Sequence, residues 1–260
     1  MNIKQVTSVY FSPTGNTKTA VELIAGQLPW KQGRLDLTDA GRRPEYHFME
    51  NEAVVVGVPV YGGRVPATAS ERLKRLHGRK TAAVLVVTYG NRAYEDALLE
   101  LKLILQRQGF CPLAAAAVPA EHNIVRSIAQ GRPDKADRKR LKQFGRELGR
   151  RFWELSSNYR IGDLKVPGHR PFRKFHGVPL KIKVGSSCKG CNTCIRKCPV
   201  QAISRTDPRI TDTERCIVCM RCVKQCPSGT RKINTMVLLA VAQKLKKACG
   251  ERKEAEFFIS

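Results

Sequence analysis

Apolar and polar residues alternate in two ways along the first 155 positions. Short runs of β-branched and other apolar residues, typical of strands, are separated by longer stretches with the apolar spacing of amphipathic helices. The predicted strands are Val6–Phe11, Arg34–Leu37, Ala53–Val58, Thr81–Thr88 and Leu113–Val118. The predicted helices are residues 17–28, 67–77, 93–108 and 134–155. This order predicts an α/β domain with a five-stranded parallel sheet, and the apolar third and fourth strands predict a sheet covered on both faces.

The remainder of the chain loses this alternation. Residues 156–183 contain prolines, glycines and basic residues without a sustained period, which indicates a linker. Residues 184–233 form a cysteine-rich segment, and residues 234–260 are expected to form a C-terminal helix and tail. The helix has a basic, amphipathic pattern, which favours packing against the neighbouring domain over binding to a membrane surface.

The cysteines carry the strongest chemical signal. The chain has 10 cysteines, and all but Cys111 and Cys249 lie between positions 188 and 226. They form two copies of the pattern Cys-x-x-Cys-x-x-Cys-x-x-x-Cys-Pro, offset by 28 residues. Clustering of this kind favours metal ligation over disulfide bonds. Two zinc sites are the alternative, but zinc sites usually separate two cysteine pairs by a long gap.

The spacing of the two motifs is that of bacterial ferredoxins with two 4Fe-4S clusters, and residues 184–233 resemble the clostridial-type ferredoxin domain. In such domains the fourth cysteine of each motif binds the other cluster. Ligand set one is then Cys188, Cys191, Cys194 and Cys226. Ligand set two is Cys216, Cys219, Cys222 and Cys198. The segment Ser228–Arg231, after the second motif, departs from the ferredoxin pattern.

A short polar loop follows the first predicted strand. It contains Ser12, Thr14, Gly15, Asn16 and Thr17 and leads directly into a helical pattern. Backbone N–H groups at the start of a helix, together with small hydroxyl side chains, favour binding of a phosphate group. The loop is neither a Walker motif nor a dinucleotide-binding motif. Simple capping of the helix is the alternative explanation.

Two further loops lie at the carboxyl ends of later strands, where doubly wound folds bind their ligands. Their candidate site residues are Pro59, Val60, Tyr61 and Gly62 in one loop and Thr88, Tyr89, Gly90, Asn91 and Tyr94 in the other. Together with the phosphate-binding loop, they make the first 155 residues resemble flavodoxin.

The resemblance implies a flavodoxin-like doubly wound fold that binds FMN. It implies that Ser12, Thr14 and Thr17 offer hydroxyl groups to the phosphate, and that Gly15 and Asn16 offer backbone N–H groups. It also implies that the isoalloxazine ring lies between two tyrosines. Tyr61 is then the inner contact and Tyr94 the outer stacking face, although each is equally suited to a core or an interface.

Familiar flavodoxins carry acidic residues in the loops that face the flavin, whereas the corresponding stretches here have Gly62, Gly63, Arg64, Asn91 and Arg92, which are neutral or positive. Negative charge near the ring opposes an anionic hydroquinone, and these residues lack it. Positive groups near the ring stabilise an anionic hydroquinone, so we expect a flavin that is more easily reduced than in an ordinary flavodoxin.

The chain as a whole is basic, with 47 Lys and Arg against 22 Asp and Glu, a net charge of +25. This charge favours an acidic partner, and an acidic electron carrier fits the two predicted cofactors. The five histidines show no metal-binding spacing. The N-terminal residues lack the pattern of a secretory signal, and no apolar run approaches the roughly 20 residues of a membrane span, so a cytoplasmic protein is expected.

The sequence therefore predicts an electron-transfer protein that connects two 4Fe-4S clusters with FMN in one chain. One alternative is a ferredoxin-dependent flavin reductase that acts on a small organic substrate. Another is a redox-sensing protein that binds nucleic acid, for which the basic charge is the sole support.

Overall fold

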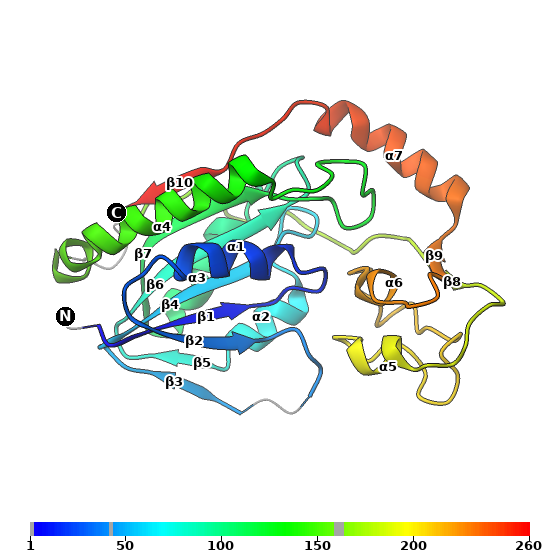
Figure 1. Ribbon diagram of the computed structural model, residues 1–260, viewed down its shortest axis with the longest axis horizontal. Coiled ribbons are helices and arrows are strands. Elements are labelled where there is room, and N and C mark those ends of the chain that lie inside the picture. Colours follow the sequence, from blue (N-terminus) through cyan, green and yellow to red (C-terminus); the bar gives the residue numbers. More distant parts are fainter. Residues whose placement is uncertain (1–2, 42–43, 159–163) are drawn as a thin grey trace.

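The computed structural model describes residues 3–41, 44–158 and 164–260 and is organised around one twisted sheet (Figure 1). The strand order is β10-β7-β6-β4-β1-β2. The strands are β1 Gln5–Tyr10, β2 Lys31–Asp36, β4 Glu52–Pro59, β6 Thr81–Tyr89, β7 Phe110–Pro119 and β10 Glu256–Ile259. The first five are parallel and follow the order of flavodoxin-like doubly wound folds. The predicted fold is confirmed.

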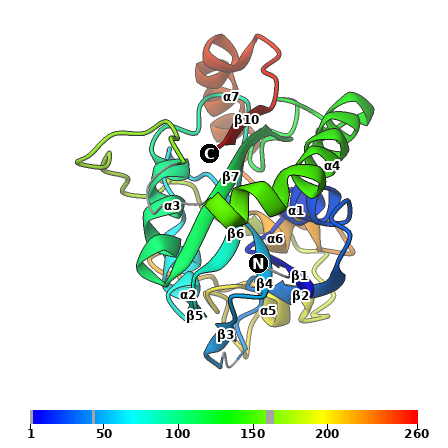
Figure 2. The same cartoon turned by 90° about the vertical axis from the view of Figure 1, so that its left-hand side faces the viewer.

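Helices cover both faces of the sheet, as Figure 2 shows. They are α1 Asn16–Ala25 and α4 Lys135–Asn158 on one face, and α2 Ala67–Leu73 and α3 Ala97–Arg107 on the other. A small two-stranded sheet, β3 Tyr46–Phe48 with β5 Leu76–Gly78, lies at the margin. Because both faces are covered, residues of β4 and β6 such as Val56 and Leu85 have no exposed surface.

The cysteine-rich segment folds beside the carboxyl ends of the parallel strands (Figure 1). Its elements are β8 Ile182–Val184, α5 Thr193–Lys197, α6 Arg221–Lys224 and β9 Arg231–Ile233. We call residues 182–233 the cysteine module. Strands β8 and β9 pair antiparallel and bring the two ends of the module together.

The segment between the sheet and the module is fixed to the first domain over much of its length. From Leu164 to Lys181 it forms neither helix nor strand. Leu164 is nevertheless fully buried, and its carbonyl accepts a hydrogen bond from Lys102 Nζ (2.6 Å). The Asp96 carboxylate accepts bonds from the backbone N–H groups of His169 and Arg173 (3.0 and 2.8 Å). The predicted linker is thus packed onto the domain along residues 164–173.

The chain then returns from the module to the sheet. Helix α7, Thr235–Cys249, packs through Leu238 and Val241 against Val125 and Ile128 of the first domain. Strand β10 follows and pairs antiparallel with β7. The sequence predicts five strands, whereas the sheet described here has six. Strand β10 was not predicted because its four residues are too few to show a clear strand pattern. The module is therefore connected to the first domain at both of its ends.

Candidate functional site

The predicted phosphate-binding loop lies at the amino end of α1, with Gly15 as its last residue before the helix. Gly15 has a φ of 94° and provides no side-chain cap. Ser12 Oγ accepts from the Lys18 N–H (2.9 Å), and Thr38 Oγ1 accepts from the Ser12 N–H (2.7 Å). These bonds hold the loop in shape, and a Cβ added at Gly15 meets no atom within 4 Å. The loop thus combines a helix amino end with open space, as an anion site requires.

The other hydroxyl and amide groups of this loop are oriented by neighbouring strands. Thr17 is buried, and its Oγ1 lies 2.6 Å from Oγ1 of Thr88, which is also a predicted site residue. Asn16 Nδ2 donates to the carbonyl of Glu121 (3.1 Å). Thr14 is half-buried. The structure therefore brings the phosphate-binding loop and the end of β6 into direct contact.

The second predicted loop forms a tight turn. Tyr61 and Arg64 exchange backbone hydrogen bonds (3.0 and 3.1 Å), and both residues between them, Gly62 and Gly63, have positive φ angles. A two-residue turn of this geometry requires positive φ at both central positions, which glycine adopts without strain. The N–H of Val60, which follows Pro59, donates to the Thr88 carbonyl (2.8 Å). The second and third predicted loops are thus adjacent.

In the third loop, the side chains of Asn91 and Tyr94 contact the returning chain, whereas the sequence predicts that they face the flavin. Asn91 is buried, and its side chain bonds the carbonyls of Cys249 and Glu251 in the returning chain (2.9 and 2.8 Å). Tyr94 is 8 % exposed, and its hydroxyl donates to Glu256 Oε2 (2.8 Å).

The rings of Tyr89 and Tyr94 pack at 5.3 Å, and burial raises the pKa of Tyr89 to about 12. Tyr94 thus lies in the core under β10 and not as the exposed outer face that the resemblance implies. Gly90 lies against the ring of His122. Burial first, and the charge of Arg92 second, lower the pKa of His122 to about 4.

The arginines expected near the flavin are paired with carboxylates. Arg64 binds Glu100 through two hydrogen bonds (2.7 and 2.8 Å), and Arg92 binds Glu95 (2.7 Å). An arginine paired in this way contributes much less field than a free charge. The part of the expectation that rests on positive charge is therefore weakened, and the part that rests on the neutral residues Gly62, Gly63 and Asn91 stays a prediction.

In the module, the predicted ligand set two is gathered around buried sulfurs. Burial first, and then the charges of Cys222, Cys198 and Cys216, act to raise the pKa of the free Cys219 thiol, which reaches about 12. Cys198 and Cys216 also act on Cys222, and these three residues belong to one buried group.

Ligand set one is more exposed. Burial raises the pKa of the free Cys226 thiol, but hydrogen bonds with Ser228, Thr230 and the backbone outweigh it and bring the pKa down to about 6. Cys226 in turn acts on Cys191, a member of the same set. Cys188 is half-buried and Cys194 is buried. A thiol with a depressed pKa readily supplies the thiolate that ligation needs.

The module contacts the predicted flavin loops directly. Lys224 Nζ on α6 donates to the Thr14 carbonyl in the phosphate-binding loop (2.6 Å). The neighbouring Arg221 forms an ion pair with Asp39 (2.8 Å). Tyr61 lies close enough to Cys219 for the thiolate, after burial, to raise the tyrosine pKa.

These contacts were not predicted from the sequence. Arg72 on α2 adds another, because it donates to the Pro199 carbonyl of the module. Ile217, between two ligand positions, packs against the apolar core of the first domain. The general excess of basic residues was the one available signal, and it does not indicate which of them reach across the domain boundary.

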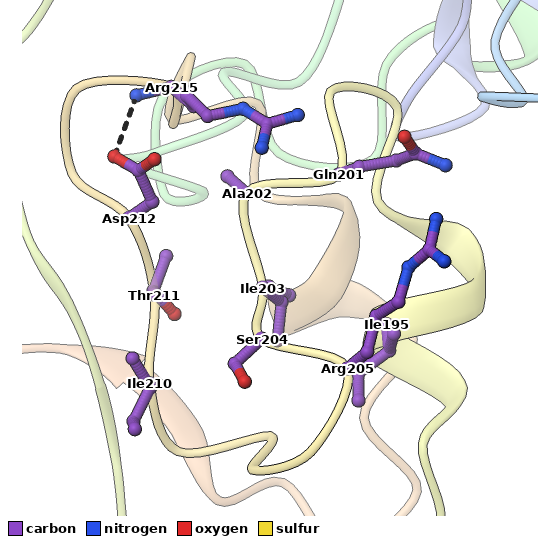
Figure 3. A pocket seen from close by; sticks show the side chains of 10 residues that line it. All are labelled: Ile195, Gln201, Ala202, Ile203, Ser204, Arg205, Ile210, Thr211, Asp212 and Arg215. Carbon is purple, nitrogen blue, oxygen red and sulfur yellow. Dashed lines mark hydrogen bonds between the residues drawn. The ribbon is translucent and has the colours of Figure 1, made fainter.

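A depression of about 350 Å³ lies on the module itself (Figure 3). Its lining combines apolar residues with two arginines, Arg205 and Arg215. The Arg215 N–H donates to Asp212 Oδ1 (3.1 Å), the contact dashed in Figure 3. Ile210 at its margin is 60 % exposed. The Ala202 N–H, also from this lining, donates to Cys198 Sγ (3.3 Å), so the depression adjoins a predicted cluster ligand.

Comparison with known proteins identifies the chemistry of the module. Residues 187–230 match the family model described as a 4Fe-4S dicluster domain. The predicted pair of 4Fe-4S clusters is thereby confirmed. No curated protein matches the chain in sequence.

Solved structures with a similar fold include a flavodoxin from Bacillus cereus, at 16% identity over 60% of this chain and 100% of that one, with a TM-score of 0.41. A flavodoxin from the domain Archaea is 14% identical over 56% of this chain and 97% of its own, with a TM-score of 0.38. Rubredoxin oxygen:oxidoreductase from Desulfovibrio gigas is 15% identical, covers 59% of this chain and 38% of its own, and has a TM-score of 0.43. The strand order described above, and not these scores, establishes the doubly wound fold.

Two searches of the described residues found nothing. Within residues 3–41, 44–158 and 164–260, no three His, Cys, Asp or Glu side chains converge on a position for a single metal ion. Across those same ranges, no helix has the length and apolar character of a membrane span.

Proposed function

We propose that this protein is a cytoplasmic electron carrier that moves electrons between two 4Fe-4S clusters and an FMN bound at the carboxyl edge of the sheet. One observation carries the proposal: the module rests on the predicted flavin loops. The 2.6 Å bond from Lys224 to the Thr14 carbonyl, together with the electrostatic influence of Cys219 on Tyr61, supports a position of the clusters beside the expected flavin site. Direct transfer between cofactors needs such proximity.

The residues of the phosphate-binding loop fit FMN. The amino end of α1 begins after Gly15, which has no side chain to cap it and leaves open space before the helix. Ser12 Oγ accepts from the Lys18 N–H in the first turn of the helix and holds the loop around this space. Lys224 adds a positive charge at the outer side of the loop. When bound, the flavin supplies a centre that accepts one or two electrons, which lets one-electron clusters serve a two-electron acceptor.

The contacts also support an order of transfer. Cys219 belongs to ligand set two, and Lys224 and Arg221 flank Cys222 of the same set. The cluster held by set two is therefore the one that exchanges electrons with the flavin.

The depression on the module supports an acidic electron carrier as the external partner. Exposed Ile210 provides an apolar contact, and Arg205 and Arg215 provide positive charge around it. Such a combination attracts an acidic surface and then buries apolar area. The adjacent Cys198 gives the partner a short route to a cluster.

The two alternative functions receive less support. Phe175 packs against Gly62 of the second loop, and the module packs against the phosphate-binding loop, so protein covers part of the predicted flavin site. This coverage favours exchange between cofactors over turnover of a free organic substrate. Nucleic-acid binding is supported by net charge alone.

Anaerobic purification followed by rapid mixing tests the proposal. We expect about eight irons, about eight sulfides and one FMN per chain. After mixing with a limiting one-electron reductant, the clusters are expected to bleach first and the flavin absorbance to follow at a rate that does not depend on protein concentration.

Two results would contradict the proposal. One is a preparation that binds iron but not FMN under saturating flavin. The other is flavin reduction whose rate increases in proportion to protein concentration, because this would indicate transfer between molecules and not within one.

A further inference from the structure

Arg231 is a buried arginine whose guanidinium lies among cluster ligands. It is the first residue of β9, and 2 % of its surface is exposed. Its Nη1 lies 3.5 Å from Cys194 Sγ, a sulfur of ligand set one. The same nitrogen donates to the Pro208 carbonyl (2.6 Å), and Nη2 donates to Thr211 Oγ1 (2.8 Å), a residue visible in Figure 3.

The guanidinium also reaches ligand set two. Cys194, which the guanidinium contacts, lies in one buried group with Cys198, Cys216 and Cys222 of ligand set two. The charge of Arg231 accordingly acts on Cys222 and Cys216 to favour their thiolate forms. One cation therefore lies between sulfurs assigned to two different clusters.

The remaining neighbours of Arg231 do not neutralise it. Within the described ranges, no ion pair joins Arg231 to an aspartate or glutamate, and its buried Nε makes no hydrogen bond. Arg132, by comparison, is equally inaccessible and forms a 2.6 Å ion pair with Asp137. A buried charge without an opposite charge is costly, so the compensating negative charge must come from the cysteine sulfurs and the iron-sulfur clusters they hold.

We propose that Arg231 is a shared tuning residue that raises the reduction potentials of both clusters together. Each cluster gains one negative charge when it accepts an electron, and a nearby cation stabilises that state more than the oxidised one. Because Arg231 is buried, dissolved salt screens it little, unlike the exposed lysines and arginines of the module. The inference rests on the two clusters and does not require the flavin.

Redox titration of the anaerobically purified full chain, followed by electron paramagnetic resonance, tests this role. The variants are Arg231→Gln, Arg231→Lys and the matched control Arg209→Gln, which removes an exposed arginine from the loop that Arg231 contacts through Pro208 and Thr211. In Arg231→Gln we expect the reduction equilibrium of each cluster to become at least about tenfold less favourable, which corresponds to 59 mV for one electron. The control is expected to change by less than about twofold.

Arg231→Lys separates charge from geometry. Lysine keeps the positive charge but presents one compact ammonium in place of a planar group that spans two sets of partners. We therefore expect the potentials of the two clusters to shift by different amounts, with at least one retained better than in Arg231→Gln. A purely structural role would lower thermal stability and leave the potentials of the assembled clusters unchanged.

The outcomes are distinct from those of the electron-transfer proposal, which concerns transfer to the flavin in the unaltered protein. Potentials of both clusters in Arg231→Gln and Arg231→Lys that equal those of Arg209→Gln would overturn the tuning role. If Arg231→Gln does not hold iron, the cluster potentials of Arg231→Lys are compared with those of Arg209→Gln to test the tuning role. Loss of iron from both variants with a fully loaded control would assign Arg231 to cluster assembly and also overturn it.

Discussion

The sheet domain and the cysteine module are stabilised by different means. The sheet has an extensive apolar layer on each face, in which residues such as Val56, Leu85 and Leu101 are fully buried. The module has two small buried groups, and one of them contains Cys194 and Cys198 among its members. Hydrophobic burial can fold the first region, whereas the second depends on ligation of its clusters. Regular apolar periodicity thus specifies the sheet domain, and cysteine spacing specifies the module.

Removal of a cluster ligand is expected to have the largest effect and to act on the module alone. Cys219→Ser removes a buried sulfur of ligand set two. Because cluster binding contributes to folding, we expect iron to fall from about eight to about four per chain and residues 182–233 to become sensitive to protease. Iron analysis and limited proteolysis measure these changes.

The matched control for this experiment is Cys111→Ser, which alters a cysteine in β7 of the sheet domain. It is expected to keep its iron. Full iron content in Cys219→Ser would contradict both the ligand assignment and the stated difference between the two regions.

Truncation of a core side chain is expected to destabilise the sheet domain and to leave the iron content of the module unchanged. Leu101 on α3 is fully buried, and Leu101→Ala should lower the free energy of unfolding of the sheet domain by about 3 kcal/mol while iron content stays the same. Urea denaturation followed by circular dichroism checks the first expectation. Leu103→Ala, at a half-buried position of the same helix, should cost clearly less. Equal losses at the two positions would argue against the described burial.

Acid is expected to lower the stability of the sheet domain through His122, whose Nδ1 accepts from the N–H groups of Ile124 and Val125. The pKa of His122 is about 4 in the folded protein, below the ordinary value of 6.5, so the unfolded chain binds the proton first. The associated stability is present above pH 6.5 and is lost as the pH falls toward 4. Between pH 7.5 and 5.5 the unfolding free energy should fall by about 1 kcal/mol.

Urea titrations at the two pH values measure this change, and His122→Gln should remove it. A pH dependence of the same size in His122→Gln would assign the effect to other groups.

The smallest expected effect concerns the link between the returning chain and the sheet. Tyr94→Phe removes the hydrogen bond to Glu256. Since Glu256 is exposed and can bond water instead, the cost should be about 0.5 kcal/mol. Thermal denaturation compares it with Tyr46→Phe, at a half-buried tyrosine of β3. A loss well above that of Tyr46→Phe would show that β10 depends on this bond more than its exposure suggests.

Most of the fold could be predicted from local patterns in the sequence. The apolar runs at Ala53–Val58 and Thr81–Thr88 predict strands that the structure contains, because full burial on both faces demands an unmistakable composition. Strand β10 has no comparable apolar run, and its pairing with β7 depends on the position in which α7 leaves the following residues.

In the candidate site, too, features set by the local sequence could be predicted, and contacts between distant residues could not. The glycine turn at Gly62 and Gly63 and the loop before α1 are local, and the sequence predicted a loop at both positions. The bond between Lys224 and Thr14 joins residues 210 positions apart, and the bond between Asn91 and Cys249 joins residues 158 apart. Nothing in a local pattern specifies such partners, which is why Asn91 and Tyr94 were assigned to the flavin.

Because β10 closes the outer side of β7, the two regions are poor candidates for separate expression. A fragment ending at residue 155 would leave the alanine-rich strand Phe110–Pro119 with a free edge of unpaired backbone groups. Such edges recruit strands from other molecules. Fusing β10 back onto that fragment through a short synthetic turn is the change that would make the sheet domain usable as an isolated building block.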